Sequence, residues 1–129
     1  MDTRDKIITA ERAAALVKEF RARDSALKIV TGYFDVLLAE HARRLSEIAN
    51  GAAALFVVVG EPPAPVLDSR ARAELVAALA VVNYVVPAEK MAAENLLRHF
   101  RAEEIVEEES ADLLRARRLT EHVQRRHQQ

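Results

Sequence analysis

The chain has 129 residues, half of them apolar and 30% charged, which is typical of one ordinary globular domain. The formal net charge of −1 gives no electrostatic case for binding nucleic acid, and the absence of cysteine excludes disulfides and cysteine–zinc sites. The longest apolar runs, 52–59 and 75–82, are far shorter than the roughly 18 residues that a membrane helix needs. We therefore expect a soluble, cytoplasmic protein with a single domain over residues 1–129.

The first part of the chain predicts helix, strand and helix. Residues 9–23 predict a leading helix, because Thr9 can cap it and apolar residues recur at helical spacing. A strand is expected at 28–31. A second helix should run from about 36–50 and stop at Gly51, since glycine commonly terminates helices.

The middle of the chain predicts a buried strand and a third helix. The almost continuous apolar run 53–59 is typical of a strand covered on both faces, as in a parallel sheet. The proline-rich segment 61–65 must then be a loop. Asp68 or Ser69 can cap the helix that follows. The predicted inward face of that helix consists of Ala71, Leu75, Ala78, Leu79 and Val82.

The remaining elements are two short strands and two helices. A third strand is expected at 84–86, and Pro87 is expected to open the next helix, since proline suits the first helical position. Residues 105–106 predict a fourth strand near the sheet edge, where flanking charges discourage aggregation. Ser110 is expected to cap the final helix. The two helices are predicted to turn inward Met91, Ala93, Leu96, Leu97 and Phe100, and Leu113, Ala116, Leu119 and Val123, respectively.

Charged residues concentrate near the C-terminus. Five glutamates occur in 103–109, and carboxylates splayed on a short strand are more often solvated than bound to a metal. The arginines of the final helix are expected to pair with these glutamates, in the same chain or in a partner, and an arm for nucleic acid is the weaker alternative. These arginines are Arg115, Arg117, Arg118, Arg125 and Arg126.

Strands that alternate with helices of 10 to 15 residues indicate βαβ units and a parallel sheet. We therefore predict a Rossmann-like α/β fold, a three-layer sandwich with a short, mostly parallel sheet and helices on both faces. The leading helix would occupy 9–23, the βα core 28–109 and the C-terminal helix 110–127.

The stretch 28–45 combines a strand, a glycine turn at Gly32 and a helix N-terminus, which together make a phosphate-binding arrangement. Residues 32–41, GYFDVLLAEH, resemble the signature G-x-F-D-x-x-H-x-G-H of the cytidylyltransferase-like nucleotidyltransferases. That group includes glycerol-3-phosphate cytidylyltransferase, heptose-phosphate adenylyltransferase and archaeal-type FAD synthetase. A second similarity covers 72–86, which resembles the family segment R-A-E-x-(V/L)-x-A-L…V-D-x-V-V.

The resemblance implies transfer of a nucleotidyl group from CTP or ATP, with Mg²⁺, to a phosphorylated small molecule. It also implies a homodimer, since such proteins commonly associate. His41 would stabilise the α-phosphate and Arg72 the leaving pyrophosphate. The nucleotide would be bound by Gly32, Tyr33, Phe34 and Asp35.

Two positions depart from the signature. Leu38 replaces the first motif histidine, and losing one such donor typically reduces the rate by about 100- to 1000-fold. Glu40 replaces the motif glycine and adds bulk and negative charge. The 61–65 loop is also shorter and more acidic than its family counterpart. We therefore predict a catalytically impaired member of the family, with a non-catalytic nucleotide-binding or protein-assembly module as the alternative.

Each site residue also has a purely structural interpretation. Leu38 continues an apolar helical stripe and is expected in the core, and Phe34 is expected to be a packing residue. His41 can be interpreted as a ligand-binding histidine or as an ordinary surface histidine. Asp35 fits a helix cap or a ligand contact, and Arg72 fits a phosphate contact or a solvated side chain.

Overall fold

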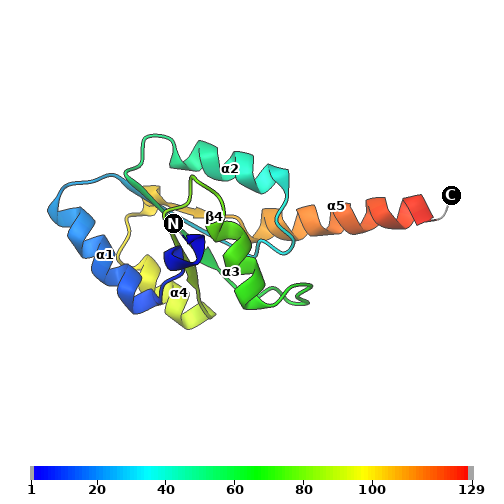
Figure 1. Cartoon of the computed structure of the whole chain (residues 1–129), viewed down its shortest axis with the longest axis horizontal. Coiled ribbons are helices and arrows are strands. Elements are labelled where there is room, and N and C mark those ends of the chain that lie inside the picture. The colour runs from blue at the N-terminus through cyan, green and yellow to red at the C-terminus, as the bar shows by residue number, and fades with distance from the viewer. Residues whose placement is uncertain (1, 128–129) are drawn as a thin grey trace.

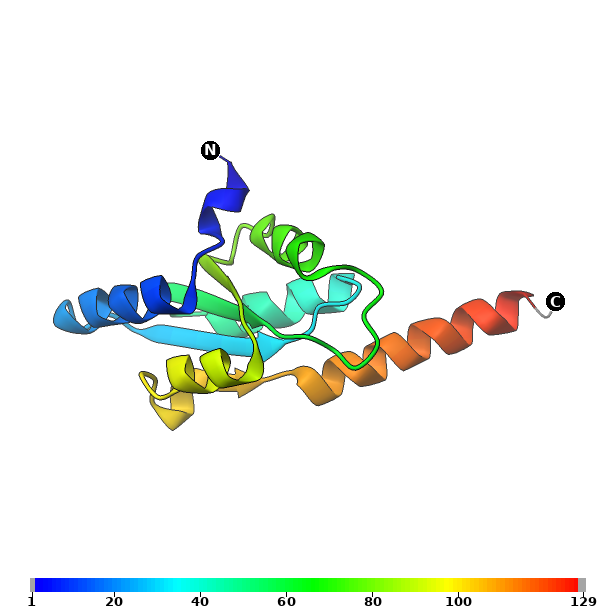
Figure 2. The same cartoon turned by 90° about the horizontal axis from the view of Figure 1, so that it is seen from below.

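The structure, a computed structural model, describes residues 2–127 as a three-layer α/β sandwich (Figures 1 and 2). Its four strands form one parallel sheet in the order β3-β2-β1-β4, so the predicted Rossmann-like fold is confirmed. The elements are η1 (Thr3–Lys6), α1 (Ala10–Ala22), β1 (Leu27–Gly32), α2 (Ala39–Ala49), β2 (Ala54–Val59), α3 (Ser69–Ala77), β3 (Tyr84–Pro87), α4 (Lys90–Leu97), η2 (Ala102–Glu104), β4 (Ile105–Glu107) and α5 (Glu109–His127).

Two hydrophobic clusters hold the layers together. Ile29 and Phe56 face α1 and α4, whereas the next residues along the same strands, Val30 and Val57, face α2 and α3. This alternation follows from the two-residue period of a strand. Every residue of β2 is buried, as its continuous apolar run predicts for a strand covered on both faces. None of the helices described is both long and apolar enough to cross a lipid bilayer.

Three predicted end signals are confirmed. The Thr9 hydroxyl accepts a hydrogen bond from the backbone N–H of Arg12 at 3.1 Å, and so caps α1. Asp68, rather than Ser69, caps α3. Gly51 follows α2 with a φ of +83°, a conformation that glycine adopts without strain.

The start of α2 differs from the prediction. The helix begins at Ala39 rather than near residue 36, because Phe34 has a φ of +52° and the chain stays irregular up to Leu38. No side chain at the N-cap position accepts a first-turn N–H of α2; instead, Nδ1 of His41 accepts the backbone N–H of the N-cap residue. Leu38 lies at the N-cap position and is half-buried, outside the hydrophobic cluster beneath α2, so its predicted core position is wrong.

The predicted inward faces of α3 and α4 are partly wrong. In α3 the buried residues are Arg72, Ala73, Val76 and Ala77, whereas Leu75 is exposed. Alanine is small and apolar enough to lie on either face of a helix. The alanine-rich sequence of α3 therefore did not indicate which face packs against the core. In α4 Leu96 is buried but Met91 is exposed.

Pro87 does not open α4, as the sequence suggested, but ends β3, where it pairs with Val59. The strand β3 lies at an edge of the sheet, and an edge strand tolerates the missing N–H of proline.

The last helix, α5, projects from the body as a rod (Figures 1 and 2). It begins at Glu109, so Ser110 is a first-turn residue and not its cap. Its predicted inward residues Leu113, Leu119 and Val123 are exposed, because most of the helix extends beyond the sheet.

The glutamates before α5 are not all solvated, contrary to the prediction. Glu104 and Glu108 are buried and pair with Arg21 and Arg44, respectively. Of the arginines of α5, Arg115 approaches Glu108 at 3.7 Å. The two buried carboxylates therefore tie the short edge strand β4 and the root of α5 to the helices α1 and α2.

Candidate functional site

The turn after β1 encloses a carboxylate from α5. Oδ2 of Asp112 accepts hydrogen bonds from the backbone N–H groups of Tyr33, at 2.7 Å, and Phe34, at 3.2 Å. A Cβ added at Gly32 would lie 2.6 Å from the same oxygen, so only glycine leaves room for this approach. The backbone donors that a strand–turn–helix arrangement offers to a phosphate thus bind an internal anion.

His41 contacts the same carboxylate from the first turn of α2. Its Nε2 lies 2.6 Å from Oδ1 of Asp112, and its Nδ1 accepts the backbone N–H of Leu38 at 2.9 Å. Because Nδ1 accepts a hydrogen bond, the ring proton is on Nε2, and this N–H donates a hydrogen bond to Asp112. The ring is only 3% exposed, so it is not a surface histidine, and both of its nitrogens have protein partners.

Arg115 completes the group of donors around Asp112. Its Nη1 lies 3.0 Å from Oδ1, one turn along α5. Burial alone would raise the pKa of Asp112, but the hydrogen bonds from His41 and from the backbone of Tyr33 outweigh it. The pKa of this carboxyl therefore lies below its usual range. Asp112 is a carboxylate at neutral pH.

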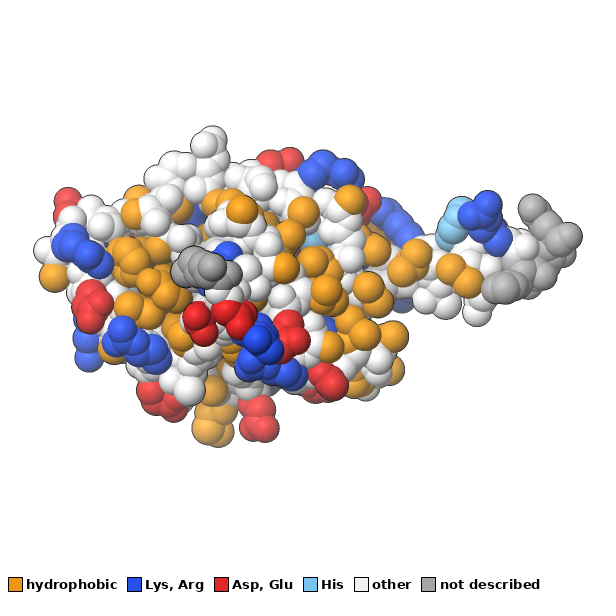
Figure 3. All heavy atoms as spheres, in the orientation of Figure 1, with side chains coloured by type: hydrophobic (Ala, Val, Ile, Leu, Met, Phe, Trp, Pro, Cys, Tyr) orange, Lys and Arg blue, Asp and Glu red, His pale blue; other side chains and the backbone are white. Residues whose placement is uncertain are grey.

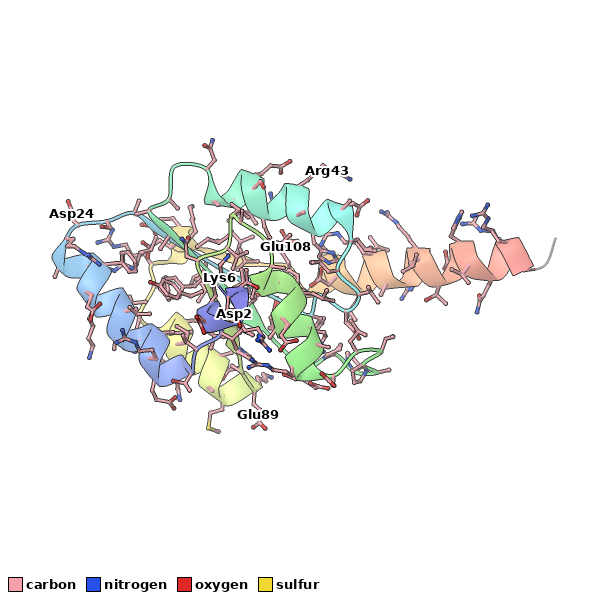
Figure 4. All side chains as sticks on the ribbon, in the orientation of Figure 1. Asp2, Lys6, Asp24, Arg43, Glu89 and Glu108 are labelled. Atoms are coloured by element: carbon pink, nitrogen blue, oxygen red, sulfur yellow. The ribbon has the colours of Figure 1, made fainter. Side chains whose placement is uncertain are left out.

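Ion pairs from α2 to α5 and to Glu108, the residue before it, surround this centre. Nε of Arg115 contacts Glu40 at 3.2 Å, and Nε of Arg44 contacts Glu108 at 2.6 Å. Figure 4 labels Glu108 near the end of α5 that joins the body. Glu40, which stands where the signature has glycine, is thus a partner of the helix that delivers Asp112. We refer to Asp112, His41, Arg115 and the Tyr33–Phe34 turn as the Asp112 centre.

Arg72 lies in α3 and makes no hydrogen bond with the residues of the Asp112 centre. Its side chain is fully buried, and Nη2 donates to Oε2 of Glu61 at 2.8 Å. Nε and Nη1 have no hydrogen-bond partner among the residues described. A buried donor without a partner typically costs about 1–3 kcal/mol, so this guanidinium has an unmet demand for an acceptor. The solvated interpretation of Arg72 is wrong.

Asp35 does not cap α2. Its two carboxylate oxygens accept the backbone N–H groups of Val66, at 2.7 Å, and Leu67, at 2.9 Å. The aspartate therefore fastens the proline-rich loop to the β1 turn. Phe34 is buried and packs against the His41 ring, with 5.4 Å between ring centroids, as expected for a packing residue.

A cavity of about 510 Å³ opens at the carboxyl ends of the strands, next to the β1 turn. Thr31, Gly32 and Tyr33 form one wall, and Thr31 donates to Glu109 at 2.6 Å. Ligands of parallel sheets bind at this edge. The charged residues that line the cavity are Glu61, Glu89, Glu94, Glu107, Glu109 and Lys90.

The structure brings together at one centre Gly32, Tyr33, Phe34 and His41, which the sequence analysis had selected. Asp112, the residue on which they converge, was not predicted from the sequence. A carboxylate in the first turn of a helix is ordinary helix chemistry, so no local signal marks it. The residues described contain no group of three or more histidine or acidic side chains that could hold a metal ion.

Comparisons of the sequence with protein-family models and with curated proteins found no match.

Proposed function

We propose that this chain is a nucleotidyltransferase-like domain that has lost nucleotidyl transfer from CTP or ATP and acts as a non-catalytic assembly module. The observation that carries the proposal is the Asp112 carboxylate, which takes the donors that a transferred phosphate would need. Leu38 and Glu40 support it, because neither side chain offers a hydrogen-bond donor to a phosphate.

An incoming phosphate would have to displace Asp112 from a buried set of charge-assisted hydrogen bonds. Each bond of this kind typically contributes about 1.5–3 kcal/mol. The internal carboxylate is also tethered to the site through α5, so it competes at a high effective concentration. If both anions stayed, they would repel by roughly 4 kcal/mol at 4 Å and intermediate dielectric.

The neighbouring cavity disfavours a triphosphate for a related reason. Its lining carries five glutamates and a single lysine, Lys90. A cleft of one sign concentrates ions of the opposite sign and repels its own. The Asp112 centre and the cavity therefore both oppose nucleotide binding, and the residues present do not fit a bound Mg²⁺–nucleotide.

Arg72 favours a second candidate, a site that still binds phosphate groups without turnover. Its unpartnered Nε and Nη1 would gain acceptors if an anion displaced Glu61. Such an anion would be the phosphate of a nucleotide or of a phosphorylated small molecule.

Calorimetric titration of CTP and ATP with Mg²⁺, together with an assay for pyrophosphate release using phosphosugars, tests both candidates. We expect no turnover and no binding heat from the natural chain. Asp112→Ala should gain binding of inorganic phosphate, because it frees the donors of the Asp112 centre. Glu121→Ala, which removes an exposed acid from the same helix, should not.

Pyrophosphate release by the natural chain would overturn the main proposal. Binding heat without turnover, lost in Arg72→Met, would favour the second candidate over pure assembly.

A further inference from the structure

The projecting helix α5 carries a stripe of small and apolar side chains, which we call the apolar stripe and which includes one threonine. Leu113, Ala116, Thr120 and Val123 follow one another at spacings of three and four residues, so they lie on one face of the helix. Leu119 borders this stripe and is 39% exposed. Figure 3 shows hydrophobic side chains along the projecting rod, away from the body. No other described element covers these side chains.

The four stripe residues are placed symmetrically about position 118 in the sequence, two on each side at equal separations. In an antiparallel pair centred there, Leu113 of one copy lies opposite Val123 of the other. Ala116 lies opposite Thr120, and these small side chains permit close approach of the two helices. The two Leu119 side chains meet beside the symmetry axis. The stripe is therefore self-complementary, as a two-fold interface requires.

Charge also favours a second copy as the partner. Beyond Asp112, α5 carries five arginines and a single acid, Glu121, although the whole chain has a net charge of −1. The rest of the protein therefore carries the opposite excess. The first turn of α5 contains the acids Glu109 and Asp112, whereas its C-terminal end contains Arg125 and Arg126. Antiparallel pairing brings these opposite ends together, whereas parallel pairing would bring like ends together.

The stripe also leads to the acidic cavity. Glu109 lies one turn before Leu113 on the same face of α5, and it lines the cavity together with Glu107. A second helix that follows the stripe toward the body therefore ends beside a carboxylate-lined opening. The arginines at the end of that helix have the charge that this opening attracts.

We propose that α5 packs antiparallel against α5 of a second copy through the stripe Leu113–Ala116–Thr120–Val123 and Leu119, which brings Arg126 beside the acidic cavity of that copy. The proposal rests on the assembly role proposed above and names its partner. The two proposals can be tested separately. Turnover by the natural chain would contradict the proposed loss of catalysis and would not affect the proposed pairing. A monomeric chain would contradict the pairing alone.

Sedimentation of the full chain over a concentration series tests the pairing. We expect a monomer–dimer equilibrium, because a four-turn helix pair makes an interface smaller than those of permanent dimers. Leu119→Asp should raise the dissociation constant at least roughly tenfold, since it buries two like charges at the axis. Leu114→Asp is the matched control, because Leu114 is 43% exposed on the opposite face and should leave the dimer unchanged.

Circular dichroism of both variants checks that the fold is kept. The charge test compares Arg126→Glu, which should weaken the dimer, with Arg118→Glu on the face opposite the stripe, which should weaken it less. A monomeric natural chain, or a Leu119→Asp dimer of unchanged affinity, would overturn the proposal. So would a monomer whose stripe binds anionic lipid vesicles, since the partner would then be a membrane surface.

Disulfide trapping resolves the orientation, because the natural sequence has no cysteine. Antiparallel pairing predicts that Leu119→Cys cross-links to itself and that Leu113→Cys cross-links to Val123→Cys. Val123→Cys alone should not cross-link, because its copies would lie about 15 Å apart, well beyond disulfide reach. Self-cross-linking of Val123→Cys would indicate a parallel pair and would overturn the proposed arrangement.

Discussion

Asp112 is the residue through which α5 and the β1 turn stabilise each other. Its carboxylate satisfies two backbone donors, a histidine and an arginine, and it reaches the turn only because residue 32 has no side chain. Gly32→Ala should therefore push Asp112 away from Tyr33 and Phe34. We expect a destabilisation of roughly 2–4 kcal/mol, from lost hydrogen bonds and steric conflict, measured by urea denaturation.

Gly60→Ala provides the control for that substitution. A Cβ at Gly60 would meet its nearest neighbours at 3.7 Å, which is ordinary contact distance. A Gly32→Ala variant as stable as the natural chain would show that Asp112 does not depend on this close approach.

The lowered pKa of Asp112 predicts a pH dependence of stability. An aspartate whose folded-state pKa lies below its unfolded value of about 3.9 stabilises the fold fully above that value. The contribution is lost as the pH falls through the folded-state pKa. The difference in unfolding free energy between the natural chain and Asp112→Asn should thus be constant from pH 7 to about 5 and shrink below about 4. Denaturant titrations at several pH values measure it, and a difference that grows with acidity would contradict this role.

At the scale of elements, an ion pair between Glu104 and Arg21 ties the segment just before the short strand β4 to α1. Glu104 accepts hydrogen bonds from Arg21 and from the backbone N–H of Arg101, and the hydrogen bond from Arg21 is the main cause of its lowered pKa. Glu104→Gln should destabilise the protein by about 1–2 kcal/mol, because the charge-assisted bonds to α1 weaken. Glu103→Gln, at an exposed neighbouring position, should change stability by less than about 0.5 kcal/mol. Equal effects in thermal denaturation would show that the pair with Arg21 does not hold β4.

The elements that the sequence predicts well are those whose local pattern has one explanation. The run that became β2 could be predicted because a strand buried on both faces has no polar alternation. The inward face of α3 could not, since alanine suits both sides of a helix. The stripe on α5 indicated an amphipathic helix correctly, but periodicity does not say whether the apolar face meets the same chain or another one.

The sequence predicted the turn of the candidate site, but it did not predict that Asp112 from α5 would fill that turn. Gly32 and His41 lie within one motif, whereas Asp112 is 71 residues beyond His41 and 79 beyond Tyr33. A contact over that separation depends on where β4 and α5 pack, which no local pattern encodes. Glu40 was predicted to impair the site through its negative charge. The structure gives it a partner, Arg115, on the helix that fills that site.

At the scale of the whole molecule, α5 has two parts with separate roles. Its first two turns belong to the body, because Asp112 and Arg115 contact the β1 turn and α2, and Glu108, just before the helix, pairs with α2. The remainder projects into solvent and carries the apolar stripe beyond Leu113 (Figure 2). Two truncations distinguish these roles. Ending the chain after residue 118 should keep the body intact, with an unfolding free energy within about 1 kcal/mol of the natural value.

Ending the chain after residue 108 removes Asp112 and leaves His41 and the turn N–H groups without their acceptor. We expect this shorter chain to lose about 3–5 kcal/mol of unfolding free energy, in line with the removal of one partner from a buried charged network. Amide hydrogen exchange should then show lost protection at Tyr33 and Phe34, with β2 unaffected until global unfolding. If both truncations were equally stable, the Asp112 centre would contribute nothing to the fold. If the longer one were also unstable, the division of α5 into a packed root and a projecting arm would be wrong.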